Sequence, residues 1–241
     1  MAPILTLETI SKRFGAIIVA NEIDLAVAPG EALGIIGPNG AGKTTLFGMI
    51  CGTTRPDSGR VRFGGNDITA LAPERRCVAG LARSFQIPQP FGGMTVFENL
   101  VVAAAFGGRK REHDVYARCI DIAARCGLAD RINRPAGTLT LLDRKRLELA
   151  RALGTDPELL LLDEIGGGLT DGEAIELVGT IRILKERNIT IVWIEHIVHV
   201  LIQVVERLIC MDSGRIIADG APAAVLSDPT VMSAYLGGMP A

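Results

Sequence analysis

The chain has 241 residues and a mass of 25.6 kDa, and its 25 basic and 27 acidic side chains give a formal net charge of −2. Hydrophobic residues make up 48% of it and aromatic residues only 4%, which is too apolar for a disordered protein and too weakly charged for a general nucleic-acid binder. Mean hydropathy is +0.32, but no segment supplies the about 18 uninterrupted apolar residues that a membrane span needs. The N-terminus lacks the basic start of a signal peptide, so we expect a cytoplasmic chain. The five cysteines contain no Cys-x-x-Cys pair, which predicts buried thiols rather than disulfides or a zinc site.

Strands and helices alternate in the first and last parts of the chain. A helix is expected over residues 43–51, and strands over 4–10, 17–27, 31–36 and 60–63, the last as an exposed edge. The alternation resumes after residue 158, with helices over 171–186 and 196–205 and strands over 159–162, 190–194, 207–211 and 215–218. Two short helices begin near Pro222 and Pro229. This alternation predicts an α/β fold built on a parallel sheet.

The middle of the chain has a different pattern. Between residues 73 and 154, Glu, Arg, Ala and Leu recur at helical spacing, which predicts few strands and helices over 95–106, 113–126 and 140–153. We therefore expect residues 1–241 to form one domain, in which an α/β core of residues 1–72 and 155–241 carries a helical subdomain of residues 73–154.

The strongest motif lies between a predicted strand and a predicted helix. It is Gly37-Pro38-Asn39-Gly40-Ala41-Gly42-Lys43-Thr44, which fits the phosphate-binding pattern G-x-x-x-x-G-K-[ST]. Glycines let backbone N–H groups surround a phosphate, and the start of the helix adds partial positive charge. Lys43 would contact the β- and γ-phosphates, and Thr44 would offer its hydroxyl to Mg²⁺. We expect these eight residues and Thr45 to bind ATP; the alternative is a glycine-rich turn that matches by chance.

A second motif ends another predicted strand, where Leu159 to Leu162 precede Asp163 and Glu164. Ligands of open α/β sheets bind at the carboxyl ends of the strands. Asp163 would hold Mg²⁺ directly or through water, and Glu164 would orient or deprotonate an attacking water. The alternative is a strand end with two acidic residues and no catalytic role.

Together these motifs make the chain resemble, over essentially its whole length, the nucleotide-binding subunit of an ABC transporter. The resemblance implies a P-loop NTPase core, a parallel sheet with an antiparallel β subdomain, and an inserted helical subdomain. It also implies that Gln86 lies in the Q-loop that links Mg²⁺ and water to the transmembrane partner. His196 is implied as the switch histidine at the γ-phosphate, and Phe14 as the aromatic residue that stacks on adenine. The implied catalytic set is Lys43, Gln86, Glu164 and His196, and the implied metal set is Thr44, Gln86 and Asp163.

One segment departs from the family pattern. Where the family has its signature Leu-Ser-Gly-Gly-Gln, this chain has Leu139-Thr140-Leu141-Leu142-Asp143. Thr140 can supply the hydroxyl of the usual Ser, whereas the two leucines limit the approach of a phosphate and Asp143 adds negative charge that opposes it. Either the signature is divergent but works, or it is a weakened half-site whose partner subunit supplies the better one.

Several other segments resemble the branched-chain amino acid uptake branch of the family. They are Lys12-Arg13-Phe14-Gly15, Ser84-Phe85-Gln86, Met94 to Leu100 and Ala234-Tyr235-Leu236-Gly237. The resemblance implies an ATPase that drives solute transport through a separate transmembrane partner, with the chain held at the cytoplasmic face of the inner membrane. Its implied partners are a second ATP-binding subunit, permease subunits that dock near Gln86 to Phe91, and indirectly a periplasmic solute-binding protein. No nucleic-acid partner is expected.

Three alternatives to this function stay open. The related ATPase type for lipopolysaccharide export shares many of these segments. A regulatory subunit with weak hydrolysis would fit the divergent signature, although the intact Lys43, Asp163, Glu164 and His196 argue against it. Soluble relatives that act in DNA repair or translation usually carry a second ATPase module or coiled-coil arms, for which 241 residues leave no room.

Overall fold

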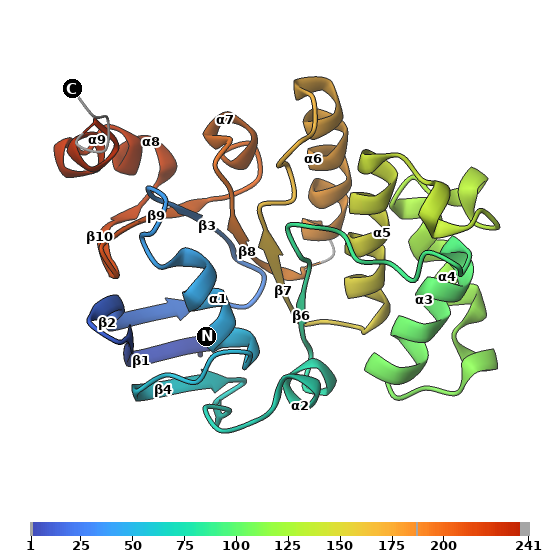
Figure 1. Cartoon of the computed structure of the whole chain (residues 1–241), viewed down its shortest axis with the longest axis horizontal. Helices are drawn as coiled ribbons and strands as arrows, with labels where there is room; N and C mark the ends of the chain where they lie inside the picture. Colours follow the sequence, from blue (N-terminus) through green and yellow to red (C-terminus); the bar gives the residue numbers. More distant parts are fainter. Residues whose placement is uncertain (1, 187, 237–241) are drawn as a thin grey trace. The chain divides into compact units, whose positions relative to one another are not determined.

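Two units of strands and helices make up the computed structural model, which describes residues 2–186 and 188–236 (Figure 1). One unit consists of Met1–Pro73 with Thr190–Ala241, and the other of Glu74–Ile189. Gly237, which belongs to one of the family-like segments, lies outside the described residues. The boundaries expected for the helical subdomain, residues 73 and 154, stay a prediction.

The first unit contains an antiparallel sheet in the order β2-β1-β4-β5. Its strands are β1 (Leu5–Phe14), β2 (Ile17–Val27), β4 (Ser58–Phe63) and β5 (Asn66–Asp67). Alternate side chains of β1, among them Leu5 and Leu7, are buried, as the period of two in a strand requires. The expectation that residues 60–63 form an exposed edge strand is wrong, because β5 pairs with the side of β4 that faces away from β1.

The same unit contains four further strands in the order β10-β9-β3-β8. They are β3 (Ala32–Ile36), β8 (Thr190–Ile194), β9 (Arg207–Asp212) and β10 (Arg215–Gly220). β3 runs parallel to both β8 and β9, and β10 pairs antiparallel with β9. Every residue of β3 and β8 is buried, which explains their continuous aliphatic runs.

The helices of this unit are α1 (Lys43–Cys51), α7 (Val198–Leu201), α8 (Pro222–Leu226) and α9 (Pro229–Leu236). α1 has the predicted bounds, and it lies beside the β1–β2 ribbon (Figure 1). α7 is shorter than the helix predicted over 196–205. The side chain of Glu195 accepts the backbone N–H groups of His196 and Ile197 at 3.0 and 3.5 Å, which holds both residues outside the helix.

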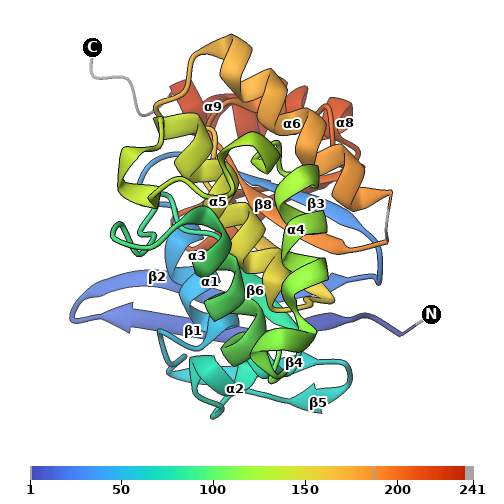
Figure 2. The ribbon, with the colours of Figure 1, turned by 90° about the vertical axis from the view of Figure 1, so that its right-hand side faces the viewer.

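The second unit combines two parallel strands with helices. β6 (Leu81–Arg83) pairs with β7 (Leu159–Asp163), and the sequence pattern missed β6 because three residues show no periodicity. The helices are α2 (Pro73–Val78), which begins at the boundary, α3 (Val96–Val102), α4 (Tyr116–Arg125), α5 (Leu141–Gly154) and α6 (Asp171–Lys185). α3, α4 and α5 pack side by side (Figure 2). The helix predicted over 95–106 changes at Ala103 into a π-helical turn that ends at Gly107.

Two expectations from composition can be compared with the structure. All five cysteines are free and four of them are buried, so the predicted buried thiols are confirmed except at the half-buried Cys77. Within residues 2–186 and 188–236, no helix combines the length and the apolar character needed to cross a bilayer.

Candidate functional site

The glycine-rich loop leaves β3 and enters α1, and its shape depends on two glycines. Gly37 has φ +148° and Gly42 has φ +102°. A Cβ at Gly37 would lie 2.1 Å from the carbonyl oxygen of Met211, and one at Gly42 would lie 2.1 Å from that of Val19. Only glycine fits at either position. The two glycines that the phosphate-binding pattern requires are therefore explained by steric contact with the neighbouring backbone.

Lys43 is buried at the mouth of this loop. Its Nζ donates to the carbonyl oxygens of Gly37 at 2.7 Å and Pro38 at 3.0 Å. The helix begins without an acidic residue in its first turn, and its N-cap, Gly42, has no side chain that could occupy the N–H groups there. Thr44 is exposed and Thr45 is half-buried, so this end of α1 combines a full positive charge, unshielded N–H donors and hydroxyl groups.

His196 leaves the sheet at the same edge as this loop. β3 and β8 are parallel neighbours, with Ile35 opposite Ile194, and the loop follows β3 while His196 follows β8. The backbone N–H of Glu195 also donates to the carbonyl oxygen of Ile35 at 3.4 Å. His196 itself is exposed. The structure therefore brings Lys43 and His196, two of the predicted catalytic residues, to one edge of the first unit.

Phe14 lies at the end of β1 with 54% of its surface exposed, and the Nζ of Lys12 lies 5.3 Å from its ring centroid. Its strand pairs with β2, whose Val19 closes on Gly42 of the phosphate loop. The hairpin that carries Phe14 thus borders the loop, and an exposed aromatic ring there has a face available for stacking.

The acidic pair stands at the end of β7 in the second unit. β6 runs parallel to β7, so Gln86, which follows β6, emerges at the same edge as Asp163 and Glu164. The Nε2 of Gln86 donates to Oε2 of Glu164 at 2.6 Å. Glu164 has φ +47°, a left-handed conformation that a residue with a side chain rarely adopts and that occurs often at active sites. The structure thus brings three more predicted site residues together.

Asp163 is buried, and its Oδ2 accepts a hydrogen bond from Nη2 of Arg83 at 2.5 Å. Its carboxylate in the second unit and the exposed hydroxyl of Thr44 in the first unit are each, taken separately, oxygen donors of the kind that Mg²⁺ prefers. Among the residues that the structure describes, no three His, Cys, Asp or Glu side chains form a metal cage, as is usual where substrate phosphates and water supply most Mg²⁺ ligands.

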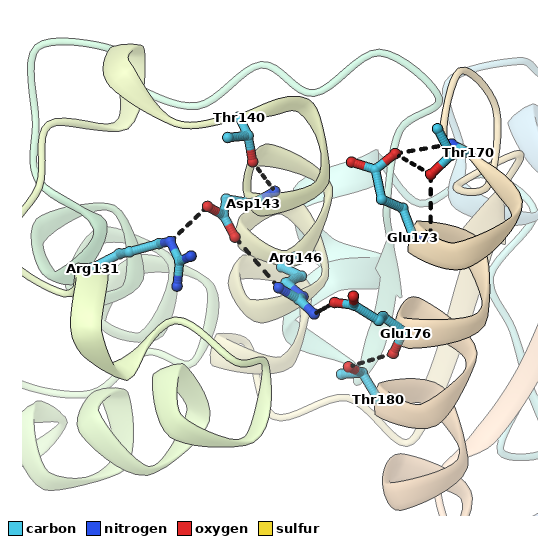
Figure 3. A network of polar contacts seen from close by, with 8 residues as sticks. All are labelled: Arg131, Thr140, Asp143, Arg146, Thr170, Glu173, Glu176 and Thr180. Carbon is cyan, nitrogen blue, oxygen red and sulfur yellow. Dashed lines mark hydrogen bonds and ion pairs between the residues drawn. The ribbon is translucent and has the colours of Figure 1, made fainter.

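The segment in place of the family signature begins α5. The hydroxyl of Thr140 caps the helix by accepting the backbone N–H of Asp143 at 3.2 Å. The side chain of Asp143 is 4% exposed and forms ion pairs with Arg131 at 2.7 Å and Arg146 at 3.4 Å (Figure 3). Arg146 extends this network to Glu176 of α6 at 2.7 Å. Two guanidinium groups therefore face the carboxylate and pair its charge within the fold, while its effect on the binding of phosphate stays a prediction.

The two leucines of this segment have different environments. Leu142 is buried in the second unit, whereas Leu141 is 43% exposed. A Cβ at Gly168, in the glycine-rich loop before α6, would lie 3.3 Å from the side chain of Leu141. Leu142 therefore packs in the hydrophobic core, and only Leu141 adds bulk to the surface where the family has glycine.

The segment around Gln86, from Phe85 to Phe91, exposes several large apolar side chains. Phe85, Ile87 and Phe91 are 50%, 70% and 47% exposed, respectively. A mostly apolar groove of about 200 Å³ lies in the same unit, lined by Met94, Phe97, Glu98, Val101, Val102, Ala105, Phe106 and Glu112. Several exposed apolar residues so close together in the chain are a feature of protein interfaces.

α5 holds the backbone of this exposed segment through three polar side chains. Nζ of the buried Lys145 donates to the carbonyl oxygen of Gln86 at 3.2 Å. Oε1 of Glu148 accepts the N–H of Gln89 at 2.9 Å, and Nη1 of Arg151 donates to the carbonyl oxygen of Gln89 at 3.0 Å. The helix that begins with the signature-like segment therefore also fixes the loop that carries Gln86.

The sequence pattern did not predict the contacts of four residues in these arrangements. Arg83 pairs with Asp163 across two strands, and only the register of the short β6 shows this. Arg131 and Arg146 compensate Asp143, but only Arg146 stands at helical spacing from it and could have been found. Tyr235 belongs to a segment that resembles the family, and its hydroxyl accepts the backbone N–H of Gly37 at 2.8 Å, a contact that no local pattern predicts.

Comparison with known proteins gives consistent matches. Residues 20–166 match the family model described as ABC transporter, and residues 215–240 match the model described as branched-chain amino acid ATP-binding cassette transporter. The chain is 34% identical to the high-affinity branched-chain amino acid transport ATP-binding proteins LivG of Escherichia coli strain K12 and BraF of Pseudomonas aeruginosa, and covers 98% of both chains in each pair. It is also 34% identical to the probable LivG of Methanocaldococcus jannaschii, with 97% of both chains covered.

Two solved structures are similar over nearly the same length. One is an ATP-binding cassette of an ABC transporter in its ADP conformation, at 34% identity and a TM-score of 0.91, with 98% of this chain and 100% of that chain covered. The other is a nucleotide-free ATP-binding cassette, at 33% identity and a TM-score of 0.88, with 97% and 98% covered.

Proposed function

Because the chain belongs to the ABC transporter family, we propose that it is the ATP-hydrolysing subunit that drives branched-chain amino acid import through a separate transmembrane partner. Membership of the family makes the chain an ATPase, and the expected P-loop NTPase fold is confirmed by the solved cassettes. The observation that carries the proposal for the site is the hydrogen bond of 2.6 Å between Gln86 and Glu164 at the end of β7. It holds the Glu164 carboxylate, one residue after the buried Asp163, in place to accept a proton from a water that attacks the phosphoanhydride of ATP.

Binding of ATP would depend on residues 37–45. The N–H groups of the loop and of the start of α1 would surround the phosphates, and Lys43 would move its charge from two carbonyl oxygens to the β- and γ-phosphates. Mg²⁺, when held by Thr44 and Asp163, supplies charge that stabilises the leaving phosphate oxygens. Phe14 would stack on the adenine ring.

In the hydrolytic step a water oxygen attacks the γ-phosphorus, and the bond between this phosphorus and the oxygen that bridges to the β-phosphate breaks. Glu164 accepts a proton from the water, and Gln86 keeps the carboxylate in place through its Nε2. His196 would donate to a γ-phosphate oxygen from its exposed position after β8. The products are ADP and phosphate.

Each ATP would be held between the phosphate loop of one subunit and the segment Leu139 to Asp143 of a second. The compensated charge of Asp143 supports a divergent signature that works, because its carboxylate faces two arginines. Thr140 uses its hydroxyl to cap α5, so the N–H groups at the start of this helix would provide most of the attraction to phosphate.

The permease would dock on the exposed side chains of Phe85, Ile87 and Phe91 and on the neighbouring groove. A cytoplasmic helix of the permease would cover this apolar surface, which places the chain at the cytoplasmic face of the membrane through its partner. The hydrogen bonds from Lys145, Glu148 and Arg151 support this role, because they tie the backbone of the docking loop to α5, so that the two would move together.

Uptake of radiolabelled amino acids tests the proposal in cells whose own gene is replaced by a variant. Lys43→Ala should abolish uptake of leucine, isoleucine and valine but leave glutamate uptake unchanged. Lys185→Ala, at the end of α6, is the matched control and should transport normally. Uptake of all three amino acids at the wild-type rate in Lys43→Ala cells would refute the proposed transport role.

A further inference from the structure

The C-terminal helix reaches the nucleotide site through one side chain. Tyr235 lies in α9, and its hydroxyl accepts the backbone N–H of Gly37 at 2.8 Å. Gly37 is the first residue of the phosphate loop, directly after β3. The two residues are 198 positions apart in the chain and belong to the same unit, so the contact is a tertiary one.

The side chain of Tyr235 is presented by an anchored helix. Val231 is only 3% exposed, and it lies one helical turn before Tyr235 on the same face of α9. α9 packs on β10, and α8 packs on both β9 and β10. Burial also raises the pKa of the Tyr235 hydroxyl, so the group stays neutral at physiological pH. An uncharged acceptor is therefore held at a defined place beside Gly37.

Gly37 is bonded on both of its sides. Its N–H donates to Tyr235, and its carbonyl oxygen accepts Nζ of Lys43 at 2.7 Å. Its Cα stands close to the backbone of β9, because a Cβ there would lie 2.1 Å from the carbonyl oxygen of Met211. If Gly37 were displaced, its carbonyl oxygen would move too, and with it the acceptor that holds Nζ of Lys43.

We propose that Tyr235 is a positioning residue of the nucleotide site, whose hydroxyl fixes the start of the phosphate loop and thereby sets the affinity for ATP. The inference rests on the proposed function only in taking residues 37–45 as the ATP site. Tyr235 does not touch the reacting atoms, so its removal should raise the KM for ATP and leave kcat nearly unchanged.

Tyr235→Phe tests the inference because it removes the hydroxyl and keeps the aromatic ring. Tyr116→Phe is the matched control: it is the other tyrosine of the chain, and its hydroxyl bonds Glu112 on the surface of the second unit. Binding of a fluorescent ATP analogue should be about three- to tenfold weaker in Tyr235→Phe, the range expected for one lost hydrogen bond. Tyr116→Phe should bind as the wild type does.

Amide hydrogen exchange, measured by NMR without nucleotide, tests the contact directly. The Gly37 amide should exchange at least about fivefold faster in Tyr235→Phe, since its acceptor is gone. The Leu46 amide, which bonds the carbonyl oxygen of Gly42 at 2.8 Å, should exchange at the wild-type rate.

Equal ATP affinity and equal Gly37 exchange in the two tyrosine variants would overturn the inference. So would a Tyr235→Phe protein in which Gly37 and Leu46 exchange faster by the same factor, because that result indicates general loosening. A wild-type chain that binds no ATP would contradict the proposed function instead, and the exchange of Gly37 would still decide the role of Tyr235.

Discussion

Asp143, in the signature-like segment, forms two ion pairs whose contribution to stability can be measured. Asp143→Asn keeps the shape of the side chain and removes the charge that faces Arg131 and Arg146 (Figure 3). Breaking a fully buried pair costs about 3–5 kcal/mol, because the remaining charge has no partner. Here the cost should be smaller. Arg131 is 37% exposed and can be solvated, and Arg146 keeps its ion pair with Glu176.

We expect Asp143→Asn to lower the free energy of unfolding by about 1–2 kcal/mol, since one charge-assisted hydrogen bond at 2.7 Å is weakened while the contact at 3.4 Å contributes little. Each kcal/mol corresponds to a fall in Tm of about 2–4 °C for a chain of this size. Urea denaturation and thermal scans of wild type and variant measure the difference.

Asp121→Asn is the matched control, because Asp121 pairs with Arg125 on the exposed face of α4. A surface pair of this kind contributes only about 0.3–0.5 kcal/mol. An equal loss of unfolding free energy in the two variants would refute the argument that the Asp143 ion pairs stabilise the fold more than a surface pair does. ATP affinity offers a second refutation: a clear gain in affinity in Asp143→Asn would show that the carboxylate opposes nucleotide despite its two arginines.

Three further outcomes are expected. Gly37→Ala should weaken ATP binding at least about tenfold in calorimetry, because the loop must shift away from Met211; unchanged affinity would contradict the steric argument. Thr95→Ala should lower stability to urea by about 1 kcal/mol, since it removes the hydroxyl that accepts the backbone N–H of Glu98 in the capping box of α3, and a loss near zero would count against it. The hydrogen bond from Arg118 is the largest cause of the lowered pKa of Asp156, which is about 2 in the folded chain and 3.8 for an ordinary aspartate. This carboxylate therefore stabilises the fold above about pH 4, and the stabilisation is lost as the pH falls toward 2. Wild type should be more stable than Asp156→Asn by less than about 1 kcal/mol, because solvent screens this ion pair. This difference in the free energy of unfolding should shrink between pH 5 and pH 3, and a constant difference would contradict the argument.

Local patterns predicted those parts of the site that depend on neighbouring residues. The turn from β3 into α1 has its predicted bounds because Gly37 and Gly42 permit backbone conformations that few other residues adopt. Asp163 and Glu164 could be placed at a strand end because four leucines precede them. In both cases the motif and its structural context lie within about ten residues of each other.

Contacts that depend on strand register or on tertiary packing could not be predicted in this way. The hydrogen bond between Gln86 and Glu164 requires that β6 and β7 be parallel neighbours, and β6 is too short to show a pattern. Compensation of Asp143 by Arg131 depends on how a short turn folds against α5. Tyr235 meets Gly37 only after the whole C-terminal segment has packed.

The most direct test of the central claim is the rate of phosphate release by the chain assembled with its transmembrane partner, compared between wild type and Glu164→Gln. Glu74→Gln, an exposed change on α2, serves as the control. We expect a loss of about 100-fold or more in Glu164→Gln, as is usual when a general base is removed, with ATP binding and the Glu74→Gln rate unchanged. Hydrolysis at the wild-type rate in Glu164→Gln would contradict the assignment of Glu164 and the role of its hydrogen bond from Gln86.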